Sequence, residues 1–255
     1  MELVFLGTRG EIDVRSRLHR RHSALLIERC ARIMIDCGAD WLDQLNAIAP
    51  TAIVLPHAHP DHAFGLAHGA PCPVYATEAS WGALHLFPIK DRRTVPLNRR
   101  LTIGGVSFWA VPIMHSTRAP ALGYRVSADG AAFFYAPDIA ALADASKALA
   151  TIDVYIGDGA SIKRSMVRLK HGALIGHAPI AAQLGWCAEA KIQRAIFTHC
   201  GTPIVRGNVR ALDRLIRELG REHGVDASLA RDGDRLSLPP MAPERERVHE
   251  HARAG

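Results

Sequence analysis

The stretch IVLPHAHPDHAFGL, residues 53–66, places three histidines and an aspartate directly after a run of aliphatic residues. A short apolar run that ends at a proline predicts a buried β-strand. Alternate side chains of an extended segment point the same way, so His57 and His59 would face one cation together. The proline after His59 suits the first turn of a helix, which would turn Asp61 and His62 toward the same cavity from another side.

Imidazole nitrogens and carboxylate oxygens are ligands that zinc, manganese and iron accept. Four such residues at the end of one strand therefore predict a metal site rather than a surface loop. Donors that approach from two sides fit two ions better than one. A metal pair also needs more than four donors, so further ligands must come from elsewhere in the chain.

Three later strand patterns end on the same kinds of residue: His115 in FWAVPIMHS, Asp138 in AAFFYAPDIA and His199 in RAIFTHCG. Strand ends that meet at one edge would bring these donors together on rigid elements. The predicted ligand set is His57, His59, Asp61, His62, His115, Asp138 and His199.

Strand and helix patterns mingle along the chain without a repeat or a linker, which predicts one α/β domain over residues 1–238. The polar residues 239–255 are expected to be disordered. A hairpin is predicted over 228–238, with its turn at Asp232-Gly233. The predicted strands cover residues 2–7, 23–28, 32–38, 52–56, 73–76, 106–113, 121–127, 131–137, 153–158 and 194–199. The predicted helices cover residues 40–48, 77–87, 139–150, 179–190 and 209–224.

The composition is that of a soluble globular protein, with 48% hydrophobic and 22% charged residues among 255. No apolar run is long enough to cross a membrane. The first residues lack the basic region of a secretory signal, and the five cysteines show no paired spacing. We therefore expect a cytoplasmic protein with reduced thiols and no membrane partner.

The formal net charge of +6 is concentrated in two basic segments, residues 15–22 and 162–171. Each segment can line the site of an anionic substrate or form a solvated surface, and the pattern leaves both open. Aromatic residues do not interleave with either segment, which disfavours a stacking platform for single-stranded nucleic acid. The candidate substrate contacts are Arg15, Arg17, Arg20, Arg21, Lys163, Arg164 and Arg168.

The order HAHPDH, His115, Asp138, His199 resembles the metallo-β-lactamase superfamily, over residues 2 to about 238. The resemblance implies an αβ/βα four-layer sandwich, with two mixed β-sheets flanked by helices and a di-metal site. It also implies that Asp36 in MIDCG orients the ligand loop by a hydrogen bond. The implied ligands are His57, His59 and His115 for one metal and Asp61, His62 and His199 for the other, with Asp138 bridging.

The opening LVFLGTRG and the stretch from GHAPIAA to THCG are similar to the ribonuclease Z and phosphonate-pathway phosphodiesterase branch. This likeness makes His177 a candidate proton donor, with nearby His171 as the alternative; His68 is expected to be structural. Only 22 residues separate His115 from Asp138, which leaves no room for the long arm with which ribonuclease Z grips tRNA. A tRNA substrate is therefore disfavoured, although other nucleic acids stay possible.

Two adjacent cations activate water and stabilise charge on an attacked phosphorus or carbon, so hydrolysis is the expected reaction. We expect a phosphodiesterase for a small or short anionic substrate, with Asp61 contacting the nucleophile and His177 protonating the leaving group. Two divalent ions are expected, zinc from the ligand types, with manganese or iron as alternatives. Three other functions stay open: a hydrolase of carboxylic esters, lactones or thioesters, a mono-iron dioxygenase, and a non-catalytic metal-binding module. Monomer and homo-oligomer also stay open.

Overall fold

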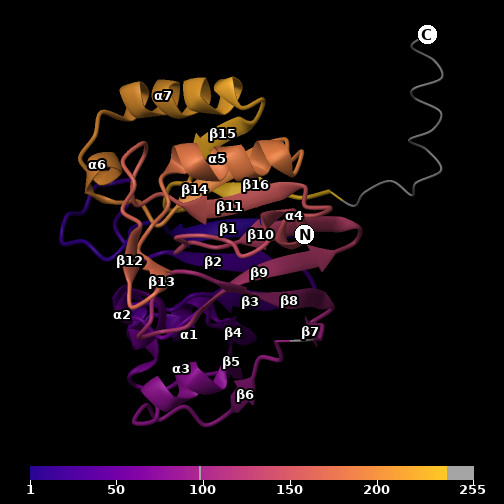
Figure 1. Cartoon of the computed structure of the whole chain (residues 1–255). Coiled ribbons are helices and arrows are strands. Elements are labelled where there is room, and N and C mark those ends of the chain that lie inside the picture. Colours follow the sequence, from indigo (N-terminus) through magenta and orange to yellow (C-terminus); the bar gives the residue numbers. More distant parts are fainter. Residues whose placement is uncertain (98, 240–255) are drawn as a thin grey trace.

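Two seven-stranded β-sheets face each other in the computed structural model, which describes residues 1–97 and 99–239 (Figure 1). Each sheet contains both parallel and antiparallel neighbours, which confirms the predicted mixed sheets. The first sheet has the order β16 (Arg235–Ser237), β1 (Glu2–Gly7), β2 (Ala24–Glu28), β3 (Arg32–Ile35), β4 (Ala52–Val54), β5 (Val74–Ala76), β6 (Arg92–Thr94). The second has the order β15 (Asp226–Leu229), β14 (Arg194–Thr198), β11 (Val154–Asp158), β10 (Ala131–Tyr135), β9 (Ala121–Ala128), β8 (Val106–Ile113), β7 (Leu101–Ile103).

Three apolar interfaces separate four layers, as the αβ/βα sandwich requires. The central interface packs side chains such as Phe5 and Ile27 of the first sheet against Phe108 and Tyr124 of the second. The outer face of the second sheet is covered by α4 (Ala145–Ala148), α5 (Ile180–Glu189) and α7 (Val209–Glu222). The outer face of the first sheet packs against η1 (Ala39–Trp41), α1 (Leu45–Ile48), α2 (Pro60–Ala63), η2 (Phe64–Leu66) and α3 (Glu78–Ala83).

The residue patterns of the strands match their places in these layers. Strand β8 lies next to the edge strand β7 of the second sheet. Its residues Val106, Phe108 and Ala110 are buried, whereas Trp109, between Phe108 and Ala110, is exposed. Every residue of β11 is buried, because this parallel strand lies between neighbours and is covered on both faces. An alternating apolar pattern thus indicates a strand near the edge of the sheet, and a continuous apolar run indicates a central strand.

The predicted hairpin over 228–238 is wrong. Its two strands lie in different sheets, since β15 pairs with β14 and β16 pairs with β1. The turn at Asp232-Gly233 carries the chain between the sheets, and the Gly233 amide donates a hydrogen bond to the carbonyl of Phe5 at 2.7 Å. A turn signal specifies a local reversal of the chain but not the sheet in which each flanking strand pairs.

Three predicted helices are shorter than their patterns, and several short strands were not predicted. The predicted helix 77–87 is α-helical only over Glu78–Ala83. The predicted helix 40–48 is α-helical only over residues 45–48. The predicted helix 139–150 is α-helical only over residues 145–148. The Asp144 side chain caps α4 by accepting from the Lys147 amide at 3.0 Å, so the helix begins late. The strands absent from the prediction are β6, β7 and the hairpin of β12 (Arg168–Lys170) and β13 (Ala173–Ile175).

The predicted disordered tail, residues 239–255, lies outside the described residues except for Pro239, so its boundary at 238 stays a prediction. Among the described residues, no helix combines the length and the apolar character needed to span a membrane. All five cysteines are free thiols.

Gly38 allows α2 to lie directly against the loop that follows β3. A Cβ atom at position 38 would lie 1.9 Å from the carbonyl oxygen of Asp61. The neighbouring Cys37 amide donates to the His62 carbonyl at 2.8 Å. We expect Gly38→Ala to destabilise the protein by about 2 kcal/mol or more, because backbone must move to admit the methyl group. Urea unfolding measures this loss.

Gly185 in α5 provides the matched control. A Cβ at this position meets no atom within 4 Å. Gly185→Ala should therefore be neutral or stabilise by up to about 1 kcal/mol, since alanine favours the helix. Equal stabilities of the two variants would contradict the packing role of Gly38.

Candidate metal centre

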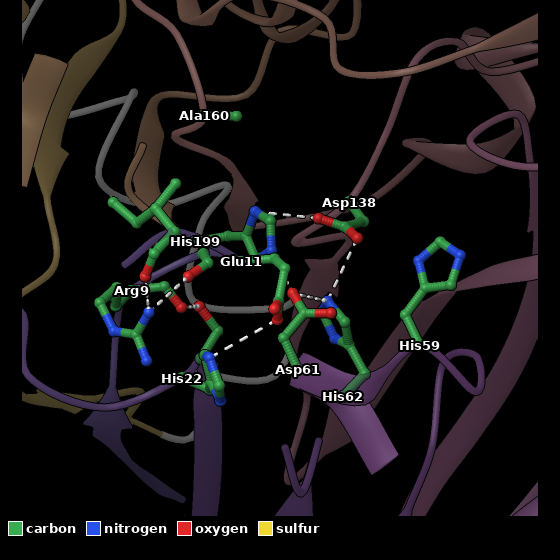
Figure 2. A network of polar contacts seen from close by, with 12 residues as sticks. Arg9, Glu11, His22, His59, Asp61, His62, Asp138, Ala160 and His199 are labelled. Carbon is green, nitrogen blue, oxygen red and sulfur yellow. Dashed lines mark hydrogen bonds and ion pairs between the residues drawn. The ribbon is translucent and has the colours of Figure 1, made fainter. Parts of the chain in front are cut away.

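The seven predicted donors converge where four strands of the two sheets end. His57 and His59 follow β4, and His59 is the N-cap of α2, with Pro60 in its first turn. The segments after β8, β10 and β14 contribute the donors from the second sheet. Figure 2 shows the side chains of His59, Asp61, His62, Asp138 and His199 gathered in one place.

One group of four donors consists of His57, His59, His115 and Asp138, whose ligand atoms lie within 4.8 Å of one another. Nε2 of His115 is 3.1 Å and Nε2 of His57 is 3.3 Å from Oδ2 of Asp138. His115 Nδ1–H donates to the Gly176 carbonyl at 3.2 Å, which turns Nε2 toward the group.

A second group consists of Asp61, His62, Asp138 and His199, again within 4.8 Å of one another. Nε2 of His199 is 2.9 Å from Oδ2 of Asp61, and Nε2 of His62 is 3.2 Å from Oδ2 of Asp138. Asp138 belongs to both groups. This division agrees with the ligand sets that the family resemblance implies, and ion binding by each residue stays a prediction.

Buried atoms without hydrogen-bond partners show that the donors fit a cation. They are Nδ1 of His57, Nε2 of His62, Oδ1 of Asp138 and Nδ1 of His199. A buried polar atom without a partner costs about 1–3 kcal/mol. Three of them, on His62, Asp138 and His199, are explained if divalent ions complete their coordination, whereas Nδ1 of His57 lies on the other side of the ring from the Nε2 that approaches Asp138.

The protonation of the first group also suits metal binding. Burial lowers the pKa of His57, His59 and His115, so these imidazoles are neutral at pH 7 and each offers a nitrogen lone pair. In the second group burial also disfavours the charged imidazole, but the carboxylates of Asp61 and Asp138 outweigh it and raise the pKa of His62 and His199. The centre therefore attracts positive charge, which a bound cation would supply.

Asp36 lies beneath the second group. Its Oδ1 accepts from His62 Nδ1–H at 2.8 Å, and its Oδ2 accepts from the Tyr135 hydroxyl at 2.7 Å. The first contact holds the His62 ring with Nε2 toward the centre, which fits the orienting role implied by the resemblance. The pattern analysis missed Tyr135, because a buried tyrosine in a strand looks like an ordinary core residue.

His177 borders the centre and forms a pair with Asp158, a residue that the sequence analysis missed. His177 Nδ1–H donates to Asp158 Oδ2 at 2.8 Å, so the ring presents Nε2 as its free nitrogen. Burial lowers the pKa of His177, but the Asp158 carboxylate outweighs this effect, and the net pKa lies above its usual value. Asp158 ends an apolar strand pattern, as Asp138 nearly does, and that signal could have found it.

The other two histidines considered from the sequence lie elsewhere. His171 is exposed in the turn between β12 and β13. His68 is exposed and contacts Asp43 at 2.9 Å. The structure therefore places His177, and not His171, beside the centre.

A family model described as the beta-lactamase superfamily domain matches residues 31–200, about two thirds of the chain. The chain belongs to the metallo-β-lactamase superfamily. A comparison with curated proteins found no match. The predicted fold and superfamily are thus confirmed.

Three solved structures illustrate the range of proteins with this superfamily fold. A diphosphatase of the PhnP family is 20% identical, with a TM-score of 0.69, over 95% of this chain and 99% of that chain. Human tRNase Z, short form, is 18% identical, with a TM-score of 0.59, over 94% and 100%. An isothiocyanate hydrolase from Delia radicum gut bacteria is 14% identical, with a TM-score of 0.65, over 94% and 100%. At these identities the likeness shows the fold alone.

A cavity of about 940 Å³ is lined by residues of both candidate donor groups and is large enough for a small-molecule substrate. Of the two basic segments, only the second lines it, through Lys163, Arg164 and Arg168. The first segment is engaged elsewhere: Arg15 pairs with Asp40 at 2.8 Å, and the guanidinium of Arg21 lies over the ring of Trp41.

A loop over residues 8–22 forms another part of the cavity wall and is held from below by Arg9. The buried Arg9 guanidinium pairs with Asp40 and donates to the carbonyls of Gly10 at 3.2 Å and Arg20 at 3.3 Å. The loop places the Glu11 side chain beside Asp61 (Figure 2). A carboxylate therefore lies beside the candidate ligand Asp61 on the cavity wall.

His22, at the end of this loop, should make the folding stability of the protein depend on pH. Burial and the nearby Arg9 guanidinium lower the pKa of His22 to about 4. The unfolded chain binds this proton near pH 6.5, so stability falls as pH decreases from about 6.5 toward 4. Between pH 7 and pH 5 the wild type should lose about 2 kcal/mol more than His22→Gln, measured by urea unfolding. The same pH dependence in both proteins would refute this assignment.

Proposed function

We propose that the protein is a phosphodiesterase that uses two divalent ions, zinc by ligand type, to hydrolyse a small or short phosphodiester in the cytoplasm. The observation that supports this proposal is the shared position of Asp138. Two groups of four donors meet at this residue, at the floor of a cavity with cationic side chains on its wall. Neither group is closed off from the cavity, as a purely structural metal site would be.

His57, His59, His115 and Asp138 would hold one ion, and Asp61, His62, His199 and Asp138 the other. Two ions in such a site lower the pKa of water and stabilise negative charge on the attacked group. The protein supplies orientation through Asp36, which fixes His62, and through the Gly176 carbonyl, which fixes His115. Asp61, with a pKa held well below its usual range, stays ionised and would accept a hydrogen bond from the attacking water.

His177 would donate its Nε2 proton to the leaving oxygen as the bond from phosphorus to that oxygen breaks. Asp158 accepts from Nδ1 and favours the protonated imidazole before the transfer. The pair thus combines an acid at the edge of the cavity with a carboxylate that orients it. A substrate with an alkoxide leaving group needs this proton more than one with a stable phenolate leaving group.

The cationic wall favours phosphorus over carbon as the attacked centre. Lys163, Arg164 and Arg168 would offset the charge of a phosphodiester, which an ester, a lactone or a thioester does not carry at its reacting group. Of the proteins with this fold, the diphosphatase and tRNase Z are named for phosphate chemistry, and the isothiocyanate hydrolase is named for a carbon substrate. Strands β9 and β10 occupy the chain between His115 and Asp138, so we favour a substrate smaller than tRNA.

The first test compares reaction classes after metal removal and reloading. Chelator-treated protein should lose at least 100-fold in turnover of bis(p-nitrophenyl) phosphate, and zinc or manganese should restore it. Metal analysis should find two ions per chain, and fewer in Asp138→Ala. Turnover of a carboxylic ester, lactone or thioester without any phosphodiester cleavage would reject the proposal. One iron per chain with oxygen consumption would instead indicate the dioxygenase.

The second test separates proton donation from binding. His177→Ala should slow cleavage of a dinucleotide, which has an alkoxide leaving group, by about 100-fold or more. It should slow bis(p-nitrophenyl) phosphate by less than about tenfold, because nitrophenolate leaves without a proton. His171→Ala, an exposed histidine on the adjacent hairpin, serves as the control and should change neither rate. Equal losses on both substrates would show that His177 does not act as the acid.

A further inference from the structure

A second cavity, separate from the metal centre, lies between the loop over residues 8–22 and the helices α6 (Thr202–Val205) and α7. Its volume of about 390 Å³ is at the lower end of the range for small-molecule sites. None of the seven candidate ligands lines it. A bound apolar molecule would remove apolar side chains of its wall from water. These side chains are Leu18, Ile204, Val205, Val209, Leu212 and Leu229.

His19 supplies a polar group beside this apolar wall. The residue lines the second cavity but is only 5% exposed. The buried Thr8 hydroxyl donates to Oδ1 of Asp232 at 2.7 Å, and its oxygen lies 2.8 Å from Nδ1 of His19. Because the hydroxyl proton is directed to Asp232, its closest acceptor, the hydroxyl oxygen accepts from His19 Nδ1–H. Nε2, the other ring nitrogen, is therefore the acceptor of this imidazole.

Nε2 of His19 lacks a donor. The contact with Thr8 is the only hydrogen bond of the ring within residues 1–97 and 99–239. Burial lowers the pKa of His19 and outweighs the opposing effect of the Asp232 carboxylate, so the ring is neutral at pH 7 and Nε2 carries a lone pair. A nearly buried acceptor without a donor is unfavourable. A ligand that donates a hydrogen bond to Nε2 would satisfy it.

The charged groups of the second cavity favour an uncharged ligand. Arg231 and Asp213 neutralise each other through an ion pair of 2.6 Å. Arg17, the remaining charged residue of the lining, is exposed, so water already solvates its guanidinium. A ligand in the cavity would therefore displace water mainly from apolar side chains and from the neutral ring of His19.

We infer that the second cavity binds a small uncharged molecule with an apolar body and one hydroxyl or N–H group that donates to Nε2 of His19. The inference goes beyond the proposed function and does not depend on the metal centre. The loop over residues 8–22 lines both cavities, with residues 10–12 at the metal centre and residues 16–19 at the second cavity. The two sites are therefore neighbours that share this loop.

Calorimetric titration of zinc-loaded protein with indole and 1-methylindole tests the inference. The two probes share one ring system, but only indole has an N–H group to donate. Indole should bind at least tenfold more tightly, because the methylated probe leaves Nε2 of His19 without a donor. In His19→Phe this preference should fall below threefold. His68→Phe, at an exposed histidine outside the second cavity, should keep the full preference.

A second variant locates the bound probe. Val209 lies at the exposed edge of the second cavity, so Val209→Trp adds bulk there without disturbing a buried residue. This change should weaken indole binding at least tenfold. Circular dichroism checks the fold of each variant, and Val209→Trp keeps the test decisive if His19→Phe does not fold.

Three results would overturn the inference. The first is a preference for indole below threefold in the wild type, or a full preference that persists in folded His19→Phe. The second is unchanged indole affinity in Val209→Trp, which would place the probe elsewhere on the protein. The third is binding of indole-3-carboxylate more than tenfold tighter than that of indole, which would assign the cavity to anions.

Discussion

The shared carboxylate of Asp138 is the contact on which the site depends. It lies within 3.3 Å of His57, His62, His115 and His199, side chains that follow strands of both sheets. A buried carboxylate with several imidazoles around it is acceptable only if the charges balance, and cations bound by the two donor groups would contribute to this balance. The two sheets must therefore pack in one fixed arrangement, because a small shift between them would separate the two donor groups.

The donors were predictable because their signals are local, whereas the four-layer fold was predictable only through the resemblance to the superfamily that these donors carry. Each ligand lies at or just after the end of an apolar strand, and HAHPDH carries four of them within six residues. Asp158 and Tyr135 were missed for a different reason. Their roles depend on His177 and Asp36, which lie elsewhere in the sequence. The strand-end position of Asp158 marks it as a candidate donor without revealing its partner, and Tyr135 looks like an ordinary core tyrosine. Tertiary packing also determines in which sheets the strands beside Asp232-Gly233 pair, and which of the two basic segments lines the cavity.

Backbone conformation contributes to the centre as well. Asp36 and His199 adopt left-handed conformations, with φ of 69° and 53°, which are unfavourable for residues other than glycine. Gly10 packs against the His199 ring, and a Cβ there would lie 3.0 Å from it. The surrounding hydrogen bonds hold both residues in these conformations and so aim their side chains at the centre. The sequence did not reveal these left-handed positions, because glycine, the residue that usually occupies them, is absent from both.

The bridge between Arg9 and Cys200 has a consequence for how the protein forms. It joins the chain just after β1 to the chain just after β14, and the contact between His199 and Asp61 spans 138 positions. During synthesis strands β1 to β6 of the first sheet and the three early imidazoles can assemble before His199 emerges, whereas β16 joins the same sheet only afterwards. The donor set is therefore completed late, and ion binding by the complete centre would depend on the closing of these distant contacts near the end of folding.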